Sequence, residues 1–251
     1  MNGLQDKVAI VTAAAGGGIG KATATRLAEE GAIVVVTDSH ERRTRETAEE
    51  LARRFPGRVV GLALDVSSED SIRGVVSEVV ATRGRVDILV NNAGINVLGG
   101  VEAVKIEDWS RILDVNLTGA FHLIRAVLPS MRKNRAGAII NVSSIAAWST
   151  LGGSDAPYAS SKAALLALTR VVASEAGPDG IRCNAVAPGI VFTKWVEKNM
   201  PNVQRQAEHI PMRRLARPED IAATIAFLAS DDASYITGEA ITVSGGLFMH
   251  P

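Results

Sequence analysis

Short apolar segments rich in β-branched residues alternate with longer helical patterns along nearly the whole of this 251-residue chain. The apolar segments are almost continuously hydrophobic, which is typical of strands in a sheet that helices cover on both faces. Repeats of strand, helix and strand require right-handed crossovers and make the strands parallel. The sequence therefore predicts an α/β fold, a doubly wound parallel sheet with helices on both faces.

The predicted strands number about seven, at 8–12, 32–37, 58–64, 86–90, 138–142, 182–187 and 240–243. Helices are expected at about 19–30, 40–55, 67–84, 106–134, 158–176 and 218–229, with an irregular stretch after the sixth strand. No linker, repeat or low-complexity tract divides the chain, so we expect a single domain over 1–251. Within it, about 190–215 is expected to form a lid over the substrate.

The bulk composition describes a globular protein with a substantial core, because 47% of residues are hydrophobic and 22% charged. Lys and Arg total 27, as do Asp and Glu, so the net charge favours neither nucleic acid nor an anionic membrane. We see no secretory signal and no apolar run long enough for a membrane span, and therefore expect a cytoplasmic protein. Cys183 is expected to be a buried structural thiol, and the scattered His209 and His250 predict no catalytic metal.

A glycine cluster joins the first strand to the first helix, in Thr12-Ala-Ala-Ala-Gly-Gly-Gly-Ile-Gly20. Glycines at this place allow a tight turn and close approach of the backbone to a pyrophosphate, and the helix N-terminus supplies free amides. A glycine cluster alone is often only a turn. Its position after the first strand of a βαβ unit favours dinucleotide binding.

The second strand ends in Asp38, about 20 residues after the glycine cluster. A carboxylate at this position can accept hydrogen bonds from a ribose 2′-hydroxyl and would repel a 2′-phosphate. The sequence therefore favours NAD over NADP as cofactor. Arg42 and Arg43 leave the phosphate alternative open, although a solvated helix face explains them better.

Tyr158 and Lys162 stand four residues apart at the head of a predicted helix, so their side chains share one face. A phenol ordinarily keeps its proton to about pH 10. A nearby ammonium favours the phenolate, so the pair can act as an acid/base group near neutral pH.

Further motifs appear in order along the chain, and they are Asp65-Val66, Asn91-Asn-Ala-Gly94, Asn116 in Leu113-Asp-Val-Asn-Leu117, Ser144 in Asn141-Val-Ser-Ser144, and Pro188-Gly-Ile-Val-Phe-Thr193. With the glycine cluster and the Tyr158–Lys162 pair, they make essentially the whole chain resemble the short-chain dehydrogenase/reductase family, and its 3-oxoacyl reductase-like members in particular. The resemblance implies a Rossmann-type fold and an oxidoreductase that moves hydride between NAD and an alcohol or ketone.

The resemblance implies four catalytic residues. Tyr158 would exchange a proton with the substrate oxygen, Ser144 would hydrogen-bond that oxygen, and Lys162 would bind the nicotinamide ribose and lower the phenol's pKa. Asn116 would hold a water that relays protons from Lys162. The implied cofactor-binding residues are Gly16, Gly18, Ile19, Gly20, Asp38, Asp65, Val66, Asn92, Ala93, Gly94, Tyr158, Lys162, Pro188, Gly189, Val191 and Thr193.

Two departures from the family pattern stand out. The family's TGxxxGIG loop is one residue longer here, with alanines in place of its first glycine, and the common VDGG near the end is Val243-Ser-Gly-Gly246. The first departure bears on the shape of the loop more than on its purpose, because Gly16 and Gly17 can supply flexibility.

The substrate pocket is expected to form from 95–99, 145–156 and 190–215, which contain several large apolar side chains, Trp148, Phe192, Trp195, Met200 and Met212. They suit a hydrophobic alcohol or ketone, such as a 3-oxoacyl thioester, a sterol-like ring system or an alicyclic ketone, and suit lid packing equally well. Lys194, Lys198 and Arg205 could meet an anionic tail such as coenzyme A, although an ordinary solvated helix explains them better.

The helix that begins near Tyr158 is apolar over more than one stripe, which predicts a subunit contact and a homodimer or homotetramer. Two other functions remain open: a dinucleotide-binding scaffold or redox sensor without turnover, and an NADP-dependent 3-oxoacyl-thioester reductase that docks a carrier protein.

Overall fold

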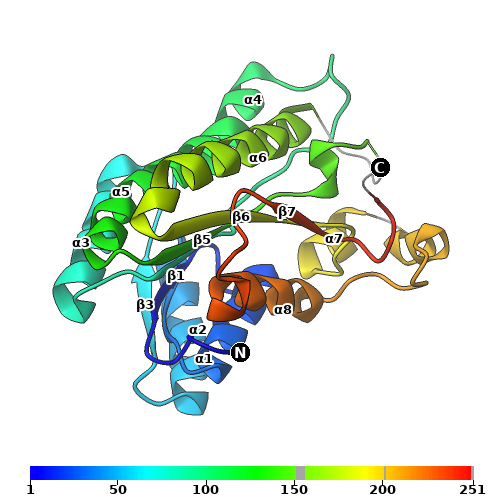
Figure 1. The fold of residues 1–251 in the computed structure, drawn as a ribbon. Coiled ribbons are helices and arrows are strands. Elements are labelled where there is room, and N and C mark those ends of the chain that lie inside the picture. The colour runs from blue at the N-terminus through cyan, green and yellow to red at the C-terminus, as the bar shows by residue number, and fades with distance from the viewer. Residues whose placement is uncertain (151–155, 201, 250–251) are drawn as a thin grey trace.

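The computed structural model describes residues 1–150, 156–200 and 202–249. Its strands form one seven-stranded sheet in the order β3-β2-β1-β4-β5-β6-β7, with every neighbouring pair parallel (Figure 1). The strands are β1 (Val8–Val11), β2 (Ile33–Asp38), β3 (Val59–Ala63), β4 (Ile88–Asn91), β5 (Gly137–Val142), β6 (Ile181–Pro188) and β7 (Ala240–Val243). The predicted doubly wound fold is confirmed.

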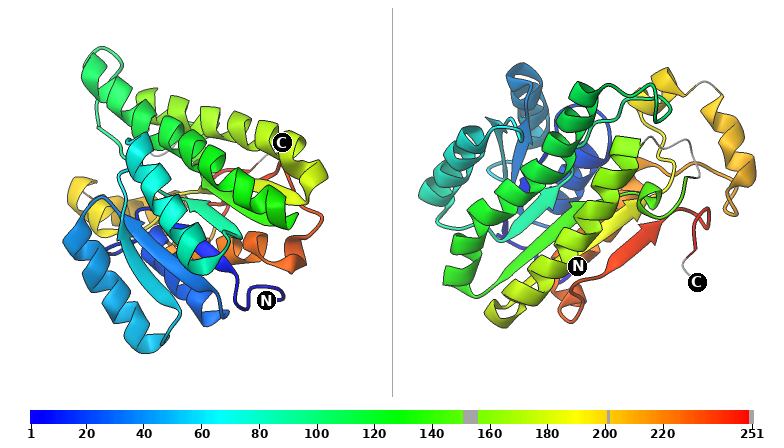
Figure 2. Two further views of the ribbon diagram at one scale, coloured as in Figure 1. Left: turned by 90° about the vertical axis from the view of Figure 1, so that its left-hand side faces the viewer. Right: turned by 90° about the horizontal axis from the view of Figure 1, so that it is seen from above.

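Helices cover both faces of this sheet (Figures 1 and 2). One face carries α1 (Ile19–Glu29), α2 (Glu41–Arg54) and α8 (Pro218–Ala229), and the other carries α3 (Glu69–Arg83), α4 (Ile106–Leu113), α5 (Gly119–Asn134) and α6 (Ala156–Ala176). Short 3₁₀ turns are η2 (Ile145–Ala147), η3 (Gly177–Asp179) and η5 (Asp231–Ala233). Ser68 caps α3 by accepting a hydrogen bond from the Ser71 amide.

Alternate residues of the central strands enter separate cores, which explains why their sequences are continuously apolar. In β1, Ala9 and Val11 pack beneath α1 and α8, whereas Val8 and Ile10 pack on the α3, α5 and α6 side. Successive side chains of a strand point to opposite faces, and here neither face meets water.

The stretch between β6 and α8 contains more regular structure than the sequence predicts. α7 (Lys194–Asn199) begins where the Thr193 hydroxyl accepts a hydrogen bond from the Val196 amide, at 3.2 Å. The 3₁₀ turn η4 (Val203–His209) follows, and Val203, Ile210 and Leu215 form a small apolar cluster of their own. Elements this short have too few turns for hydrophobic periodicity to reveal them.

By length and composition alone, the continuous helical segment 106–134 could cross a membrane. In the structure this segment packs against α3 and α6, as core helices of globular proteins do (Figure 1). Such a helix is weak evidence for a membrane protein, and the absence of a membrane partner stays a prediction.

The order of the strands fixes where a ligand can bind. From β1 the chain turns to β2 and β3 on one side, and β4 to β7 extend on the other. Ligands of open α/β sheets bind outside the carboxyl ends of the strands at this reversal. The loops after β1, β4, β5 and β6 carry the motifs that the sequence singles out.

Gly20 is the position where this edge tolerates no side chain. A Cβ added there would lie 2.3 Å from the Ala13 carbonyl oxygen and 2.7 Å from the Asn92 amide nitrogen. We predict that Gly20→Ala lowers the free energy of unfolding by about 1–3 kcal/mol, because a rigid backbone atom must move. Urea unfolding measures the change.

Gly74→Ala is the matched control. Gly74 lies inside α3 with open space around its Cα, so the same substitution should raise the free energy of unfolding by about 0.5–1 kcal/mol. Equal effects of the two changes would show that Gly20 is not held by this contact.

Candidate active site

The glycine loop leads into the N-terminus of α1. Gly18 is the N-cap residue, has φ of 146°, and leaves the first amides of the helix without a side-chain cap. A Cβ at Gly16, Gly17 or Gly18 would meet nothing within 4 Å. Free amides beside open space make this turn suitable for a phosphate group.

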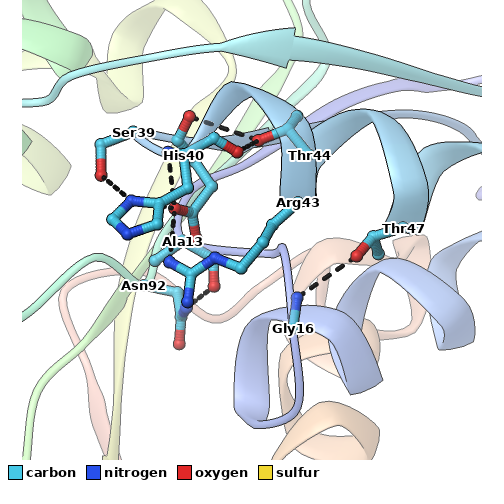
Figure 3. Close-up of polar contacts among 9 residues, drawn as sticks. Ala13, Gly16, Ser39, His40, Arg43, Thr44, Thr47 and Asn92 are labelled. Carbon is cyan, nitrogen blue, oxygen red and sulfur yellow. Dashed lines mark hydrogen bonds and ion pairs between the residues drawn. The ribbon is translucent and has the colours of Figure 1, made fainter.

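Gly16 itself turns toward α2, because its amide donates to the Thr47 hydroxyl at 3.3 Å (Figure 3). Of the predicted loop residues, Gly18 and Ile19 line cavities beside the loop, and Gly20 serves close packing.

The departure from the family's loop pattern has a structural counterpart at Ala13. This residue adopts φ of 49°, the left-handed conformation that glycine accepts without strain and alanine adopts at a cost of about 1 kcal/mol. Its carbonyl accepts a hydrogen bond from the Asn92 side chain, at 3.2 Å (Figure 3). The alanine therefore adopts a conformation that favours glycine, at the place where the family pattern has glycine.

Thr12 joins the glycine loop to the end of β4, a role that the sequence did not reveal. Its buried hydroxyl accepts hydrogen bonds from the amides of Asn92 and Ala93, both at 2.9 Å. The Asn92 side chain returns a bond to the Thr12 carbonyl at 2.8 Å. These bonds set the loop and the Asn91–Gly94 turn side by side.

A cavity of about 740 Å³ opens beside this junction and is lined by Asp38, Asp65, Val66, Ala93 and Gly94, all of them predicted cofactor-binding residues. Because a ribose 2′-hydroxyl is expected at Asp38, we call it the adenosine cavity. The Asp38 carboxylate is only 10% exposed and accepts from the His40 amide at 3.1 Å and from the Arg43 guanidinium at 3.4 Å (Figure 3).

The two arginines after β2 differ in position. Arg43 lines this cavity, so the phosphate contact that the sequence left open is possible for this residue. Arg42 pairs with Glu46 on the outer face of α2, at 3.7 Å, as expected. Helical periodicity does not tell which arginine turns to the cavity.

A second cleft, of about 510 Å³, adjoins the first, since Gly94, Ile95 and Arg111 line both. It brings together residues from the ends of β4, β5 and β6, from α1 and from the head of α6. They include Ile19, Asn92, Ser144, Tyr158, Lys162, Pro188, Gly189, Val191 and Thr193, all of which the sequence predicted for the site.

Tyr158 and Ser144 meet in this cleft. Burial raises the pKa of the Tyr158 phenol above its ordinary value, and a side-chain hydrogen bond with Ser144 acts in the opposite direction with a smaller effect. The pKa of the phenol is therefore raised by burial, whereas the sequence predicted that Lys162 would lower it. The Ser144 hydroxyl also caps η2 by accepting from the Ala146 amide, at 3.1 Å.

Lys162 is a buried ammonium, 3% exposed, that donates to the Val142 carbonyl at 2.8 Å. Its nitrogen lies 5.6 Å from the centre of the Tyr158 ring. Burial lowers the pKa of Lys162 to about 8. The group is therefore mostly protonated at neutral pH and releases its proton readily.

Asn116 lies on the π-helical turn η1 (Asp114–Thr118) between α4 and α5. Its amide nitrogen donates to the Ile95 carbonyl and the Ser161 hydroxyl, at 3.0 and 3.1 Å, and its oxygen accepts from the Ile95 amide at 2.8 Å. Both amide hydrogens are therefore used within the protein. A water held by Asn116 would have to donate to one of the oxygens of this residue.

The cleft fits a dinucleotide on structural grounds. The loop glycines leave space for phosphates, and a Cβ at Gly94 would stand only 3.2 Å from the Lys162 nitrogen. Among the described residues no group of His, Cys, Asp and Glu could hold a metal ion.

The expected substrate-pocket residues divide into two groups. Trp195 and Met200 line the cleft, whereas Trp148, Phe192 and Met212 do not. Trp148 stacks on Phe248 with ring centres 5.4 Å apart. Residues 151–155 of the second expected wall lie outside the described chain. Two further polar residues line the cleft: Asn96, which lies in the expected wall 95–99, and Arg111, which was not predicted because its stretch carries no recognisable motif.

The depressed pKa of Lys162 predicts a pH dependence of stability. Between about pH 8 and 10.5 the folded protein has released this proton and the unfolded chain has not, so this residue's contribution to stability rises with pH. Over this pH range the free energy of unfolding of the wild type, minus that of Lys162→Met, should increase by up to about 3 kcal/mol. Urea unfolding of both proteins without cofactor measures it. A constant difference would contradict the buried ammonium.

Comparisons with known proteins agree with this geometry. The family model described as enoyl-(acyl carrier protein) reductase matches residues 13–248. The chain is 45% identical to a hydroxy-methyl-oxo-hexahydroindene-carboxyl-CoA reductase of Mycobacterium tuberculosis, over 96% of this chain and 93% of that protein. It is 42% identical to the 3-oxoacyl-acyl-carrier-protein reductase FabG of Thermotoga maritima, over 98% and 99% of the two chains.

A solved structure of a 3-oxoacyl-acyl-carrier-protein reductase with bound NAD, from Brucella melitensis, superposes with a TM-score of 0.90 at 36% identity and covers 98% of this chain and 92% of that one. With the seven-stranded sheet, the glycine loop and the meeting of Ser144, Tyr158 and Lys162, these likenesses lead to one conclusion. The chain belongs to the short-chain dehydrogenase/reductase family of oxidoreductases, among its 3-oxoacyl reductase-like members.

Proposed function

We propose that this protein is an NAD(H)-dependent dehydrogenase that interconverts a secondary alcohol and a ketone, with Tyr158 as the acid/base. One observation carries the proposal: Ser144, Tyr158 and Lys162 share a cleft with the turn that follows β4. A scaffold or redox sensor without turnover would have no use for an acid/base group buried beside a hydroxyl and an amine.

When bound, the nicotinamide would supply hydride to a ketone or take it from an alcohol. During reduction Tyr158 gives its proton to the substrate oxygen as the carbonyl carbon gains hydride, so the product is a neutral alcohol and the tyrosine a phenolate. Ser144 donates a hydrogen bond to that oxygen and stabilises the charge that develops on it.

A proton-carrying Lys162 would favour the phenolate that Tyr158 becomes, since a nearby ammonium stabilises a negative charge. Its nitrogen lies 5.6 Å from the centre of the Tyr158 ring, and its pKa of about 8 suits a group that passes a proton on. We propose that the proton returns to Tyr158 through Lys162 and a water donating to an oxygen of Asn116.

NAD is the proposed cofactor, because the Asp38 carboxylate lines the adenosine cavity and would repel a 2′-phosphate. One observation favours NADP as the second candidate: Arg43 lines the same cavity and approaches Asp38 to 3.4 Å. The Arg43 guanidinium beside Asp38 could bind the 2′-phosphate of NADP.

The apolar lining suits a hydrophobic ketone, and the names of two relatives, a carboxyl-CoA reductase and a 3-oxoacyl-acyl-carrier-protein reductase, support an acyl thioester.

We further propose a single domain with a substrate lid at about 190–215, a cytoplasmic location, and assembly into a homodimer or homotetramer. Phe121 on α5 and Val171 on α6 are 44% and 60% exposed, which supports contact between subunits through these helices.

Tyr158→Phe should lower kcat by about 10²–10⁴-fold, because it removes the proton donor and leaves the ring in place. The affinity for NADH should change little. Stopped-flow turnover of a ketone substrate and fluorescence titration of NADH measure the two quantities.

Tyr235→Phe is the matched control, since Tyr235 is fully exposed and lies outside the cleft. It should leave both quantities unchanged. Retained turnover in Tyr158→Phe would remove Tyr158 from the mechanism and favour a protein that binds the dinucleotide for another purpose.

Asp38→Ser tests the choice of cofactor. The wild type should bind NADH more tightly than NADPH, and the variant should lose roughly tenfold in NADH affinity because hydrogen bonds to a charged acceptor are lost. It should gain affinity for NADPH, with Arg43 released.

Fluorescence titration with both cofactors measures these changes, and Asp70→Ser, on the exposed start of α3, is the control. Tighter binding of NADPH by the wild type would overturn the assignment to NAD.

A further inference from the structure

Ser161 is a buried hydroxyl between Tyr158 and Lys162 on α6, and the proposed mechanism gives it no role. It follows Tyr158 by three residues, precedes Lys162 by one, and is 0% exposed. Its hydroxyl donates to the Tyr158 carbonyl at 2.7 Å and accepts from the Asn116 side-chain amide at 3.1 Å. Ser161 therefore contacts both the residue that is proposed to supply the proton and the residue that is proposed to hold the relay water.

The chemistry of a hydroxyl fixes the direction of these two bonds. Ser161 has one side-chain hydrogen, which the Tyr158 carbonyl accepts, so toward Asn116 its oxygen can only accept. Asn116 must therefore present the NH₂ end of its amide to Ser161. The Ile95 backbone makes the same demand, since its amide donates to the Asn116 oxygen at 2.8 Å and its carbonyl accepts from the nitrogen at 3.0 Å. Ser161 and Ile95 together fix the orientation of the Asn116 amide.

This orientation places the oxygen of Asn116 near the amine of Lys162. A Cβ built on Gly94 would stand 3.6 Å from the Asn116 oxygen and 3.2 Å from the Lys162 nitrogen, so both atoms border the space beside Gly94. The oxygen accepts one bond from Ile95 and has a second lone pair for a water. A water in that space can donate to Asn116 and accept from the Lys162 ammonium. The NH₂ end would instead compete with Lys162 for the oxygen of the water.

The bond between Asn116 and Ser161 also ties two elements together. Asn116 lies on the π-helical turn η1, where the regular hydrogen-bond ladder of a helix is interrupted. Within the described ranges, this is the one side-chain hydrogen bond that joins η1 to α6. Asn116 is only 1% exposed, so solvent cannot readily replace a lost partner.

We propose that Ser161 is a positioning residue of the proton relay, because its hydroxyl holds the Asn116 amide with the oxygen toward the space beside Lys162. The inference rests on the proposed function and adds a residue to that site. Ser161 does not line the cleft, so it acts through Asn116. Without its hydroxyl, one buried amide hydrogen of Asn116 has no acceptor, and turning that hydrogen to the relay water reverses the direction of the bond between them.

Ser161→Ala should affect the first turnover and the later turnovers differently. In the first reduction Tyr158 already carries the proton that it gives to the ketone, so the relay is not needed. Each later turnover requires a proton to return to the Tyr158 phenolate through Lys162 and the water. The rate constant of the first turnover should stay within about twofold of the wild type, whereas the steady-state kcat should fall about tenfold.

Stopped-flow absorbance of the reduced cofactor measures both rates in one trace, with NADH or NADPH, whichever binds more tightly. The ketone is the member of a panel of ethyl acetoacetate, acetoacetyl-CoA and cyclohexanone that the wild type reduces fastest. The measurement is repeated in deuterium oxide. The steady-state rate of Ser161→Ala should fall more in deuterium oxide than that of the wild type, because the return of the proton has become the slow step.

Ser160→Ala is the matched control, since Ser160 precedes Ser161 on the same helix and is exposed. It should leave both rates and the isotope effect unchanged. An equal loss of the first-turnover rate and the steady-state rate in Ser161→Ala would show that the hydroxyl only supports the structure of the site. Rates equal to those of the wild type would show that the hydroxyl is not needed. Either result overturns the inference.

Tyr158→Phe separates this inference from the proposed function, because it should slow the first turnover itself. If Tyr158→Phe does so and Ser161→Ala matches the wild type throughout, the dehydrogenase proposal stands and the role of Ser161 is wrong. If the first turnover of Tyr158→Phe equals that of the wild type, the proposed function fails, and the role of Ser161 fails with it.

Discussion

The hydrogen bonds of Thr12 are the constraint on which the site depends. One buried hydroxyl accepts from two successive amides of the β4 turn, while the Asn92 side chain returns a bond to the loop after β1. These are the two turns at the reversal of strand order, where ligands of open α/β sheets bind. Gly20 has no room for a Cβ because the Ala13 carbonyl and the Asn92 side-chain amide crowd it.

A second constraint is the burial of Lys162. The charged amine donates to the Val142 carbonyl, and burial makes its proton easier to release. The same burial makes the Tyr158 phenol harder to ionise. The pKa of Lys162 therefore falls below that of Tyr158, which favours return of a proton from the lysine ammonium to a tyrosine phenolate. Burying both polar groups lowers the stability of the protein, as active sites commonly do.

The residues that line the cleft come from two kinds of segment, the elements of the sheet core and segments outside the sheet. Ser144, Tyr158 and Lys162 stand at the ends of β5 and at the head of α6, on elements that the whole sheet holds in place. Asn96 and Arg111 stand on the turn after β4 and on α4, outside the sheet. A change of residue on such peripheral segments disturbs the fold less than a change on the sheet.

The sequence by itself determined the sheet, the order of its strands and helices, and most residues that line the cleft. Strands buried on both faces must be continuously apolar, and motif residues at strand ends must gather at one edge of a parallel sheet. It did not reveal α7 and η4, which are too short for periodicity, nor that Arg43 turns toward Asp38 while Arg42 turns away. The direction of the Tyr158 pKa, the unpaired oxygen of Asn96 and the exposure of Arg111 to both cavities were decided by the tertiary structure, because burial and partnership depend on residues distant in the chain.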